Sequence, residues 1–405
     1  MAEIIKQGDC GDGVAYALDS DGLLTISGTG DMRNYQYNQK HKRVNVPWWK
    51  ERKDIVRIRM EQGVTSVGLE AFDGCENLID VVFSDSVTYI GSAAFDGCES
   101  LASVTIPDNV TYIGTGTFAD CKSLTSITIP DSVNSIETGA FNGCESLTSI
   151  RIPDGVTFIG EWAFHDCDAL TSVVLPDSVL EIGQRAFDGC KGLTEITLSR
   201  NLTAISPRTF HDCKRLRNVT IFDGVASIGY QAFDGCEYLT GVTIPDSVVS
   251  MGQQIFSGCK YLERVRLPAR LTSIGYEMFA GCERLSEVTI PDSVTAIEYG
   301  AFKGCKSLES VTIPESVTYI GTGAFADCKR LNHVTLPGKL VSIGQRTFAD
   351  CTALTSVTIP DSVTSIGIWA FEGCDNLRKV SVPSGAEVWA NAFPDSVTVT
   401  PRVSG

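Results

Sequence analysis

Residues 101–123 read LASVTIPDNVTYIGTGTFADCKS, and the rest of the chain is organised around copies of this stretch. Cysteines mark the copies, because fourteen of the fifteen cysteines, from Cys75 to Cys374, stand 23 residues apart without an insertion. A phenylalanine precedes each of these cysteines by three positions, from Phe72 to Phe371. A fixed period of ~20–50 residues is typical of a solenoid, in which each repeat contacts only its neighbours. We therefore predict that the 405 residues form one elongated body rather than several globular domains.

Each copy begins with a short β-strand. Val104 and Ile106 alternate with Ser103 and Thr105, which is the pattern of a strand with one buried face. Pro107 is expected to end the strand, because proline lacks the N–H group that a continuing ladder needs. Stacked copies would pair these strands at a spacing of ~4.8 Å, so that the copies together form a parallel sheet roughly 65 Å long.

The remainder of each copy returns the chain to the next strand. Gly114 is expected to permit a tight bend. The spacing of three between Phe118 and Cys121 indicates a single helical or 3₁₀ turn on the outer side. Stacking would align leucines, phenylalanines and cysteines into buried columns, of which the phenylalanine column should contribute most to stability. The predicted fold class is therefore an α/β solenoid that is mostly β.

Both ends of the chain differ from the repeat, and we predict caps there because an open solenoid end would expose its core. Two strand-like runs flank the turn Asp19–Gly22, which indicates a β-hairpin. Trp48 and Trp49 would help to cover the first repeat, or alternatively would stack on a sugar ring. The predicted segments are a hairpin cap in residues 1–54, fourteen repeats in 55–376, and a degenerate repeat, C-terminal cap and tail in 377–405.

The last of these segments keeps the register only in part. Phe393 arrives one residue early and no cysteine follows it. Residues 395–399 are expected to add a final covering strand, and residues 401–405 are expected to be a frayed tail.

Composition excludes several classes of function. The net charge of −16 would repel nucleic acid and anionic lipid, so neither is an expected partner. No run approaches 18 apolar residues, so no membrane insertion is expected. Residues 1–6 do not resemble a signal peptide, so we expect either an intracellular protein or a chain from which a signal has been removed.

Fifteen cysteines would suit a disulfide framework, but their spacing favours another interpretation. Fourteen of them hold one position of the repeat, so stacking places each thiol between equivalent neighbours. We predict buried, reduced thiols that behave as small hydrophobic groups. Disulfides and zinc are the alternatives, although the sequence has no CxxC pair and no Cys/His cluster. No metal and no cofactor are predicted.

The repeat consensus, Leu-x-x-Val-x-Ile-Pro-Asp-Ser-Val-x-x-Ile-Gly-x-x-Ala-Phe-x-Gly-Cys, resembles the BspA-like, or treponemal-type, leucine-rich repeat. Residues 354–374 match it at nearly every position, and the resemblance covers residues 55–399. Cys10-Gly11-Asp12, residues 23–30 and Pro47-Trp48 resemble the N-terminal cap of many such proteins of gut Firmicutes. The resemblance implies a right-handed, curved leucine-rich repeat solenoid with a parallel sheet on its concave side. It also implies a bacterial secreted or surface protein, often an adhesin that binds host matrix glycoproteins or other bacteria.

Outward-facing strand positions carry serine or threonine in most copies, which is typical of a solvated surface. Arg57, Arg59 and Arg151 are early exceptions. Neighbouring copies further along would bring a group of mixed charges together, because residues two apart on a strand share a face. Our hypothesis is that this group is the recognition site; the alternative is variation on a tolerant surface. The predicted ligand-binding residues are Arg217, Asn218, Glu263, Arg264, Arg266, Glu287, Glu309 and His333.

Three further rows of residues have both a structural and a functional interpretation. The row after the cysteines should form weak ion pairs between neighbouring copies: Glu237, Lys260, Glu283, Lys306 and Lys329. The acidic row after the prolines, which includes Asp131, Asp177, Asp246 and Glu315, suits turn chemistry or, alternatively, calcium. The outer aromatic residues should pack between turns or, alternatively, stack on carbohydrate: Trp162, Tyr230, Tyr276, Tyr299 and Trp369.

Nothing in the sequence marks a catalytic centre. The four histidines are His41, His165, His211 and His333, and none belongs to a recognised catalytic motif. We therefore predict a non-enzymatic, monomeric binding or adhesion protein that presents its concave sheet to a protein or glycoprotein partner. A structural spacer and a carbohydrate-binding surface protein are the alternatives. Localisation at the cell surface or in the medium follows from the resemblance, and a cytoplasmic location is the alternative.

Overall fold

The computed structural model describes residues 2–38 and 43–402, and these residues contain no helix. The chain divides into two compact units, Met1–Leu202 and Thr203–Gly405. Both units are built from turns of a β-solenoid that repeats every 23 residues, about 15 turns in all. We number the positions of a repeat from its leucine, so that Leu101 is position 1 and Ser123 is position 23.

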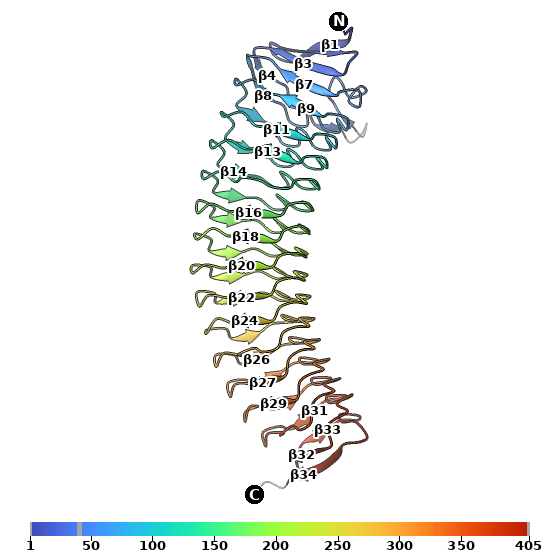
Figure 1. Ribbon diagram of the computed structural model, residues 1–405, viewed down its shortest axis with the longest axis vertical. Helices are drawn as coiled ribbons and strands as arrows, with labels where there is room; N and C mark the ends of the chain where they lie inside the picture. The colour runs from blue at the N-terminus through green and yellow to red at the C-terminus, as the bar shows by residue number, and fades with distance from the viewer. Residues whose placement is uncertain (1, 39–42, 403–405) are drawn as a thin grey trace. The chain divides into compact units, whose positions relative to one another are not determined.

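A first row of parallel strands lies at positions 3 to 5 of the repeats in the N-terminal unit (Figure 1). Each residue pairs with the residue one repeat later, as Ser103 does with Ser126. The middle residue of each strand is buried and the two beside it face outward, as the alternation predicts. The strands are β7 (Arg57–Met60), β9 (Asp80–Val82), β11 (Ser103–Thr105), β13 (Ser126–Thr128), β16 (Ser172–Val174) and β18 (Glu195–Thr197).

The sheet is made of short ladders. Strands β11 and β13 form one ladder and β16 and β18 belong to another. Ser149 lies between them and joins the second ladder only through an isolated bridge to Ser172. Most copies carry proline at position 7, and proline lacks the N–H group that would extend the pairing of a strand beyond that point.

A second row of parallel strands, which the sequence did not indicate, lies at positions 12 and 13. Its register is again one repeat, as in the pair of Tyr112 with Ser135. In the N-terminal unit this row holds β8 (Val64–Val67), β10 (Tyr89–Ile90), β12 (Tyr112–Ile113), β14 (Ser135–Ile136), β15 (Phe158–Ile159) and β17 (Glu181–Ile182). In most of these strands the first residue is partly exposed and the second, an isoleucine, is buried. The second row therefore contributes one buried isoleucine per turn to the core.

The outer side of each repeat consists of β-turns, not of a helix, and hydrogen bonds join the β-turns of successive repeats. Thr117 N–H donates to Gly114 O at 3.2 Å and Cys121 N–H donates to Phe118 O at 3.4 Å, so each bend is a β-turn. Positions 16 and 20 have positive φ, for example 52° at Trp162 and 51° at Asp120. The N–H groups of positions 16, 18 and 20 donate to carbonyls of the next turn, as from Asp120 to Asn142 at 2.7 Å. The Phe-Cys spacing predicted a helical or 3₁₀ turn here. The structure has β-turns instead, and their N–H groups donate hydrogen bonds to the next repeat.

Glycine at position 14 has a different role from the predicted bend. At Gly160 a Cβ atom would lie 2.4 Å from the backbone nitrogen of Thr138 in the preceding turn. The backbone there does not have positive φ. At Gly160 glycine is therefore favoured because two turns approach closely, and not because the chain requires a left-handed conformation there.

Columns of phenylalanine and cysteine form the core. Successive phenylalanine rings stack, as Phe141 does on Phe164 with centroids 5.3 Å apart and planes 11° from parallel. Each cysteine is free and buried, and most thiols of the column face a carbonyl of the preceding turn. Cys167 Sγ–H donates to Phe141 O at 3.2 Å, and the same bond recurs along the column. The thiol therefore satisfies a buried carbonyl as well as filling space.

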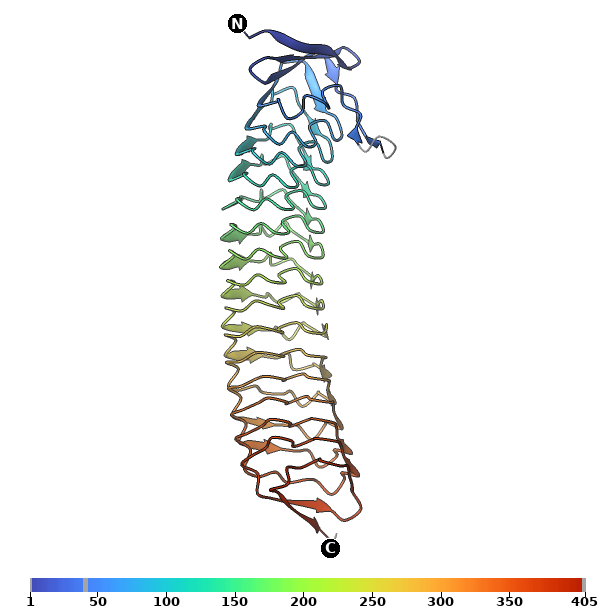
Figure 2. The same cartoon turned by 90° about the vertical axis from the view of Figure 1, so that its right-hand side faces the viewer.

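Three antiparallel strands precede the first repeat, and the last of them pairs with it. Strands β1 (Ile4–Gly11), β2 (Val14–Asp19) and β3 (Leu23–Gly28) are antiparallel, and β3 then pairs in parallel with β7 (Figure 2). Strand β4 (Gly30–Asp31) joins β8, and β5 (Tyr37–Asn38) pairs with β6 (Arg43–Val44).

Trp48 begins the phenylalanine column. Its side chain is fully buried, its ring stacks on Phe72 at 5.6 Å, and its Nε1–H donates to Ala71 O at 3.0 Å. Tyr16 of the hairpin contacts the ring edge-on at 5.1 Å. Trp48 is thus part of the cap and is not accessible to a sugar.

The C-terminal unit repeats the two rows (Figure 1). Its first row holds β20 (Asn218–Thr220), β22 (Gly241–Thr243), β24 (Arg264–Arg266), β27 (Ser310–Thr312), β29 (His333–Thr335), β32 (Lys379–Pro383) and β34 (Thr398–Arg402). Its second row holds β19 (Ala204–Ile205), β21 (Ser227–Ile228), β23 (Ser250–Met251), β25 (Ser273–Ile274), β26 (Ala296–Ile297), β28 (Tyr319–Ile320), β30 (Ser342–Ile343), β31 (Ser365–Ile366) and β33 (Glu387–Val388).

The degenerate last repeat closes this unit. Phe393 stacks on Phe371 at 5.0 Å although it arrives one residue early. Strand β34 pairs in parallel with β32 and supplies the covering strand, displaced to residues 398–402. Pro401 and Arg402 pair with β32 and Arg402 bonds to Asp361, so the prediction that the chain frays from residue 401 is wrong for these two residues. Residues 403–405 lie outside the described residues.

Candidate binding site on the strand face

A hollow of about 630 Å³ opens on the strand face of the C-terminal unit. Three neighbouring strands of the first row, β20, β22 and β24, form it. The residues that line it are Asn218, Val219, Thr220, Ile221, Gly241, Val242, Thr243, Arg264, Val265 and Arg266. Its size lies within the range of ~300–1,000 Å³ that ligand sites commonly have.

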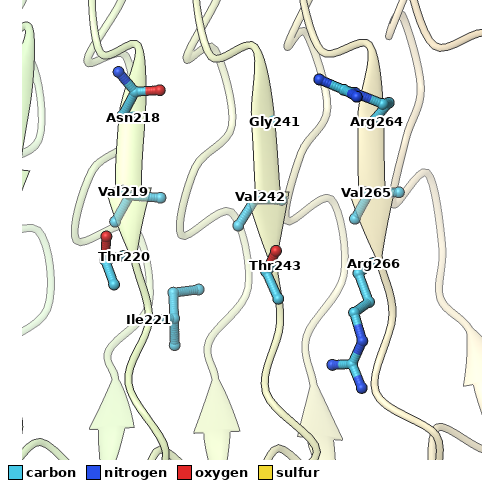
Figure 3. A pocket seen from close by; sticks show the side chains of 10 residues that line it. All are labelled: Asn218, Val219, Thr220, Ile221, Gly241, Val242, Thr243, Arg264, Val265 and Arg266. Atoms are coloured by element: carbon cyan, nitrogen blue, oxygen red, sulfur yellow. The ribbon is translucent and has the colours of Figure 1, made fainter.

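Gly241 creates the hollow. It occupies position 3, where the copies on either side carry Asn218 and Arg264. Because glycine has no side chain, position 3 of the middle strand leaves a space between the longer side chains of Asn218 and Arg264 (Figure 3). A Cβ atom at Gly241 would meet nothing closer than Arg264 O at 3.6 Å, so sterics do not require glycine here.

The two arginines of β24 differ in their partners. Arg266 binds Asp246 at 2.7 Å and donates a second hydrogen bond to Ile244 O at 3.1 Å. The pKa of Asp246 is lowered, first by the backbone N–H of Ala269 and then by Arg266. Within the described residues Arg264 has no ion pair. Figure 3 shows its side chain extending across the strand face toward β22, whereas that of Arg266 runs past the end of its own strand. Arg264 is therefore the cation at this hollow that is available to a partner.

The structure gathers three of the eight predicted ligand-binding residues at the hollow, namely Asn218, Arg264 and Arg266. Glu263 pairs with Arg284 at 3.9 Å, and Glu309 pairs with Arg330 at 2.8 Å. The other predicted residues are exposed but do not line the hollow: Arg217, Glu287 and His333.

Sequence reasoning missed the residue that makes the hollow. Gly241 is the only glycine at position 3 of the fourteen repeats, so an outlier in that column was the available signal. Thr220 and Thr243 also line the hollow and add hydroxyl groups, although threonine at position 5 is common in the chain.

The ion pairs predicted after the cysteines are confirmed in part. Lys260 lies 3.0 Å from Glu237 and Lys306 lies 2.9 Å from Glu283. Lys329 instead pairs with Asp327 at 3.4 Å. These side chains are largely solvated, so each pair contributes only a few tenths of a kcal/mol.

The acidic row after the prolines serves turns and neighbouring arginines. Asp177 accepts the N–H of Arg200 at 3.0 Å, and Glu315 accepts the N–H of Gly338 at 2.8 Å. Asp131 pairs with Arg151 at 2.7 Å, the same arrangement as Asp246 with Arg266. No group of three His, Cys, Asp or Glu residues in ranges 2–38 and 43–402 is placed to hold a metal ion.

Most of the outer aromatic residues pack between turns, as predicted. Tyr276 and Tyr299 stack at 5.0 Å. Arg346 lies 5.1 Å from the ring centroid of Trp369, and Tyr230 has a similar arginine contact. Trp162 lines a second hollow, and Tyr299 lines another.

Two of the described histidines, His165 and His211, lie beside acidic residues. His165 Nδ1 lies 3.2 Å from Asp166, and His211 Nε2 lies 3.7 Å from Asp234. His333 Nε2 lies 3.3 Å from the hydroxyl of Thr335. His41 lies outside the described residues.

Comparison with known families identifies the class of protein. Five overlapping stretches match the family described as the BspA type leucine rich repeat region (6 copies): residues 48–171, 113–240, 159–286, 203–322 and 272–400. The chain therefore belongs to the BspA-type leucine-rich repeat family, which confirms the predicted family and fold class. Protein binding is a generic role of leucine-rich repeats, and repeat proteins of this type are generally non-enzymatic scaffolds.

Solved structures of bacterial leucine-rich repeat proteins are similar to this chain. One from Bacteroides ovatus ATCC 8483 is 30% identical with a TM-score of 0.78, and the match covers 97% of this chain and 99% of that chain. One from Eubacterium ventriosum ATCC 27560 is 25% identical with a TM-score of 0.47, covering 91% and 94%. A leucine rich cell surface protein from Faecalibacterium prausnitzii A2-165 is 27% identical with a TM-score of 0.43, covering 80% and 93%.

No curated protein matches the sequence significantly. Within residues 2–38 and 43–402 there is no helix of the length and apolarity that crossing a membrane would need.

Proposed function

We propose that the protein is a non-enzymatic, monomeric adhesion protein, secreted or held at the bacterial cell surface, that binds a protein or glycoprotein through the strand face of its C-terminal unit. The observation that carries this proposal is the hollow at Gly241 with Arg264 beside it, for which the described part of the chain supplies no ion pair. Membership of the BspA-type family supports the binding role.

Charge supports an acidic partner group. The chain carries a net charge of −16, yet two arginines stand on one strand at the hollow. A carboxylate of the partner would accept hydrogen bonds from Arg264, and charge-assisted bonds of this kind are about twice as strong as neutral ones. Asn218 and the threonine hydroxyls would bond to neighbouring polar groups of the partner. The remaining predicted residues, such as Glu287 and His333, would contact it at the rim.

An array of host matrix glycoproteins, mucins and bacterial surface proteins tests the proposal. The parent protein should bind at least one of them, and the affinity should fall as salt rises. Changing Arg264 and Arg266 together to serine should weaken binding at least tenfold, because a buried charge-assisted contact is lost.

Arg151→Ser is the matched control. Arg151 occupies the same repeat position as Arg266 and has the same aspartate partner, but it lies in the N-terminal unit away from the hollow. Gly241→Glu places its Cβ atom without a close contact and adds a long, negatively charged side chain at the hollow. Full binding by Gly241→Glu or by the double variant, or equal loss in Arg151→Ser, would overturn the proposal.

A further inference from the structure

Position 16 forms a filled ladder along part of the outer side of the C-terminal unit. Arg208 Nε–H donates to Gln231 at 2.6 Å, Gln231 donates to Gln254 at 3.1 Å, and Gln254 donates to Glu277 at 2.9 Å. The ladder residues have positive φ, for example 54° at Gln231. Long side chains therefore fit this position and cover the backbone of the outer turns.

In the N-terminal unit the same column is interrupted. Position 16 is Gly116 and then Gly139, both at φ 61°, before Trp162 follows in the next turn. A Cβ atom at Gly139 would meet nothing closer than Asn142 Cβ at 3.8 Å, so the space that a ladder side chain would occupy is left unfilled. The result is a second hollow, of about 380 Å³.

An aromatic wall and a polar rim surround this hollow. Trp162 lines it and remains 38% exposed. The two glycines and Ala119 form a floor without side chains beyond Cβ. The polar groups on the rim are Thr115, Thr138, Asn142, His165 and Arg185.

Two features of the rim favour a ligand that offers hydroxyl groups. His165 Nδ1 and Asn142 Oδ1 lie 3.0 Å apart, which holds both side chains in place. Arg185 Nε is buried and has no hydrogen-bond acceptor in the described part of the chain, although Asp188 lies 3.7 Å away. A buried donor without an acceptor is unfavourable, so a ligand oxygen that reached it would be stabilised.

We propose that this hollow binds a neutral pyranose unit of an oligosaccharide, with one face of the ring against Trp162. The C–H bonds of a sugar face carry partial positive charge and pack on the negative face of an indole ring. Sugar hydroxyls then bond to Thr138, Asn142 and Arg185. Because the hollow lies in the N-terminal unit, this site is independent of the strand-face site at Gly241.

A related hollow in the C-terminal unit shows what distinguishes the proposed site. Position 16 is again glycine in two successive copies, Gly300 and Gly323, and the hollow there measures about 210 Å³. Its lining includes Tyr299, Lys303, Asp327 and Arg346, and no tryptophan, and Tyr299 stacks on Tyr276 at 5.0 Å. Trp369 has the same repeat position as Trp162 but lies against Arg346. An uncovered indole ring beside a glycine floor is therefore present in the N-terminal hollow and absent from this one.

Calorimetric titration of the 405-residue protein tests the proposal. The probes are the β-1,4-linked hexasaccharides of glucose, mannose, xylose and N-acetylglucosamine. Trp162→Ala removes the wall, and Gly139→Gln refills the column with a side chain that Gln231 and Gln254 show to fit at this position. Trp369→Ala is the matched control, and melting temperatures check that all variants fold.

The proposal requires that at least one hexasaccharide binds the parent and that its Kd rises at least tenfold in both Trp162→Ala and Gly139→Gln. Trp369→Ala should bind like the parent. Absence of heat with all four sugars at millimolar concentration would overturn it. Binding that persists in Gly139→Gln, or that Trp369→Ala weakens equally, would also overturn it.

Discussion

Replacing Phe256 with alanine tests whether the phenylalanine column holds the C-terminal unit together. The side chain is fully buried, and its ring stacks on Phe233 at 5.6 Å and on Phe279 at 5.7 Å, with both pairs of planes 7° from parallel. The backbone carbonyl accepts the thiol of Cys282 at 3.1 Å, and this bond does not need the ring. The substitution therefore isolates the contribution of the aromatic side chain.

The expected loss is in the upper part of the range for a buried phenylalanine. Truncation to alanine in a core costs about 3–5 kcal/mol, and each of the two stacked pairs contributes ~0.5–1.5 kcal/mol beyond area burial. We expect a decrease of about 4–5 kcal/mol in the free energy of unfolding. Guanidinium denaturation followed by circular dichroism measures it, because the change in midpoint at constant slope reports stability.

Tyr238→Ala is the control for this measurement. Tyr238 stacks on Tyr261 at 4.8 Å, closer than the phenylalanine pairs, but its side chain is 43% exposed. Its loss should cost no more than about 1.5 kcal/mol. If Phe256→Ala cost less than about 1.5 kcal/mol, or no more than the control, the assignment of stability to the buried column would be wrong.

Three further predictions concern the backbone, the thiols and a buried carboxyl. Gly252→Ala should destabilise the protein by about 1–3 kcal/mol in the same assay, because the added Cβ atom would lie 2.4 Å from Tyr230 N. Gly241→Ala is the control, since Gly241 has space around it, and should change stability by less than about 1 kcal/mol. Equal effects of the two substitutions would contradict the argument from close approach. The fifteen thiols are all buried, and burial raises the pKa of Cys10 to about 12. Ellman's reagent should therefore label almost none of the thiols until guanidinium unfolds the protein. Rapid labelling of several thiols in the native protein would show that the cysteine column is accessible. Burial and neighbouring carboxylates raise the pKa of Asp96 to about 7, so the folded state holds this proton more tightly than the unfolded state and stability falls as pH rises from about 4 to 7. Asp96→Asn should therefore stabilise the protein above pH 7 by about 1–2 kcal/mol and have little effect near pH 4. An effect of Asp96→Asn that does not depend on pH would refute this assignment.

The sequence by itself determined the period, the buried columns and the position of the first row of strands. Each repeat contacts only its neighbours, so the environment of Phe256 is set by residues 23 positions away that are also phenylalanine. The alternation around Val104 likewise indicates which side chains face outward, because side chains on a strand point to opposite faces in turn. The hairpin cap was predictable for a similar local reason, since a turn between two apolar runs defines it.

Only the tertiary structure decided which of the predicted residues line a hollow and which form ion pairs. Arg264 and Arg266 are two apart and equivalent in sequence, but one is paired with an aspartate and the other is not, because ion pairs form between successive turns. The hollow at Gly241 and the one beside Trp162 exist because a missing side chain in one turn leaves space between its neighbours. The close approach at the glycines of position 14 and the left-handed conformation at position 16 also arise from stacking, which brings backbones together that are 23 residues apart along the chain. A periodic sequence specifies contacts within its columns, whereas a binding site depends on where neighbouring turns fail to fill the space between them.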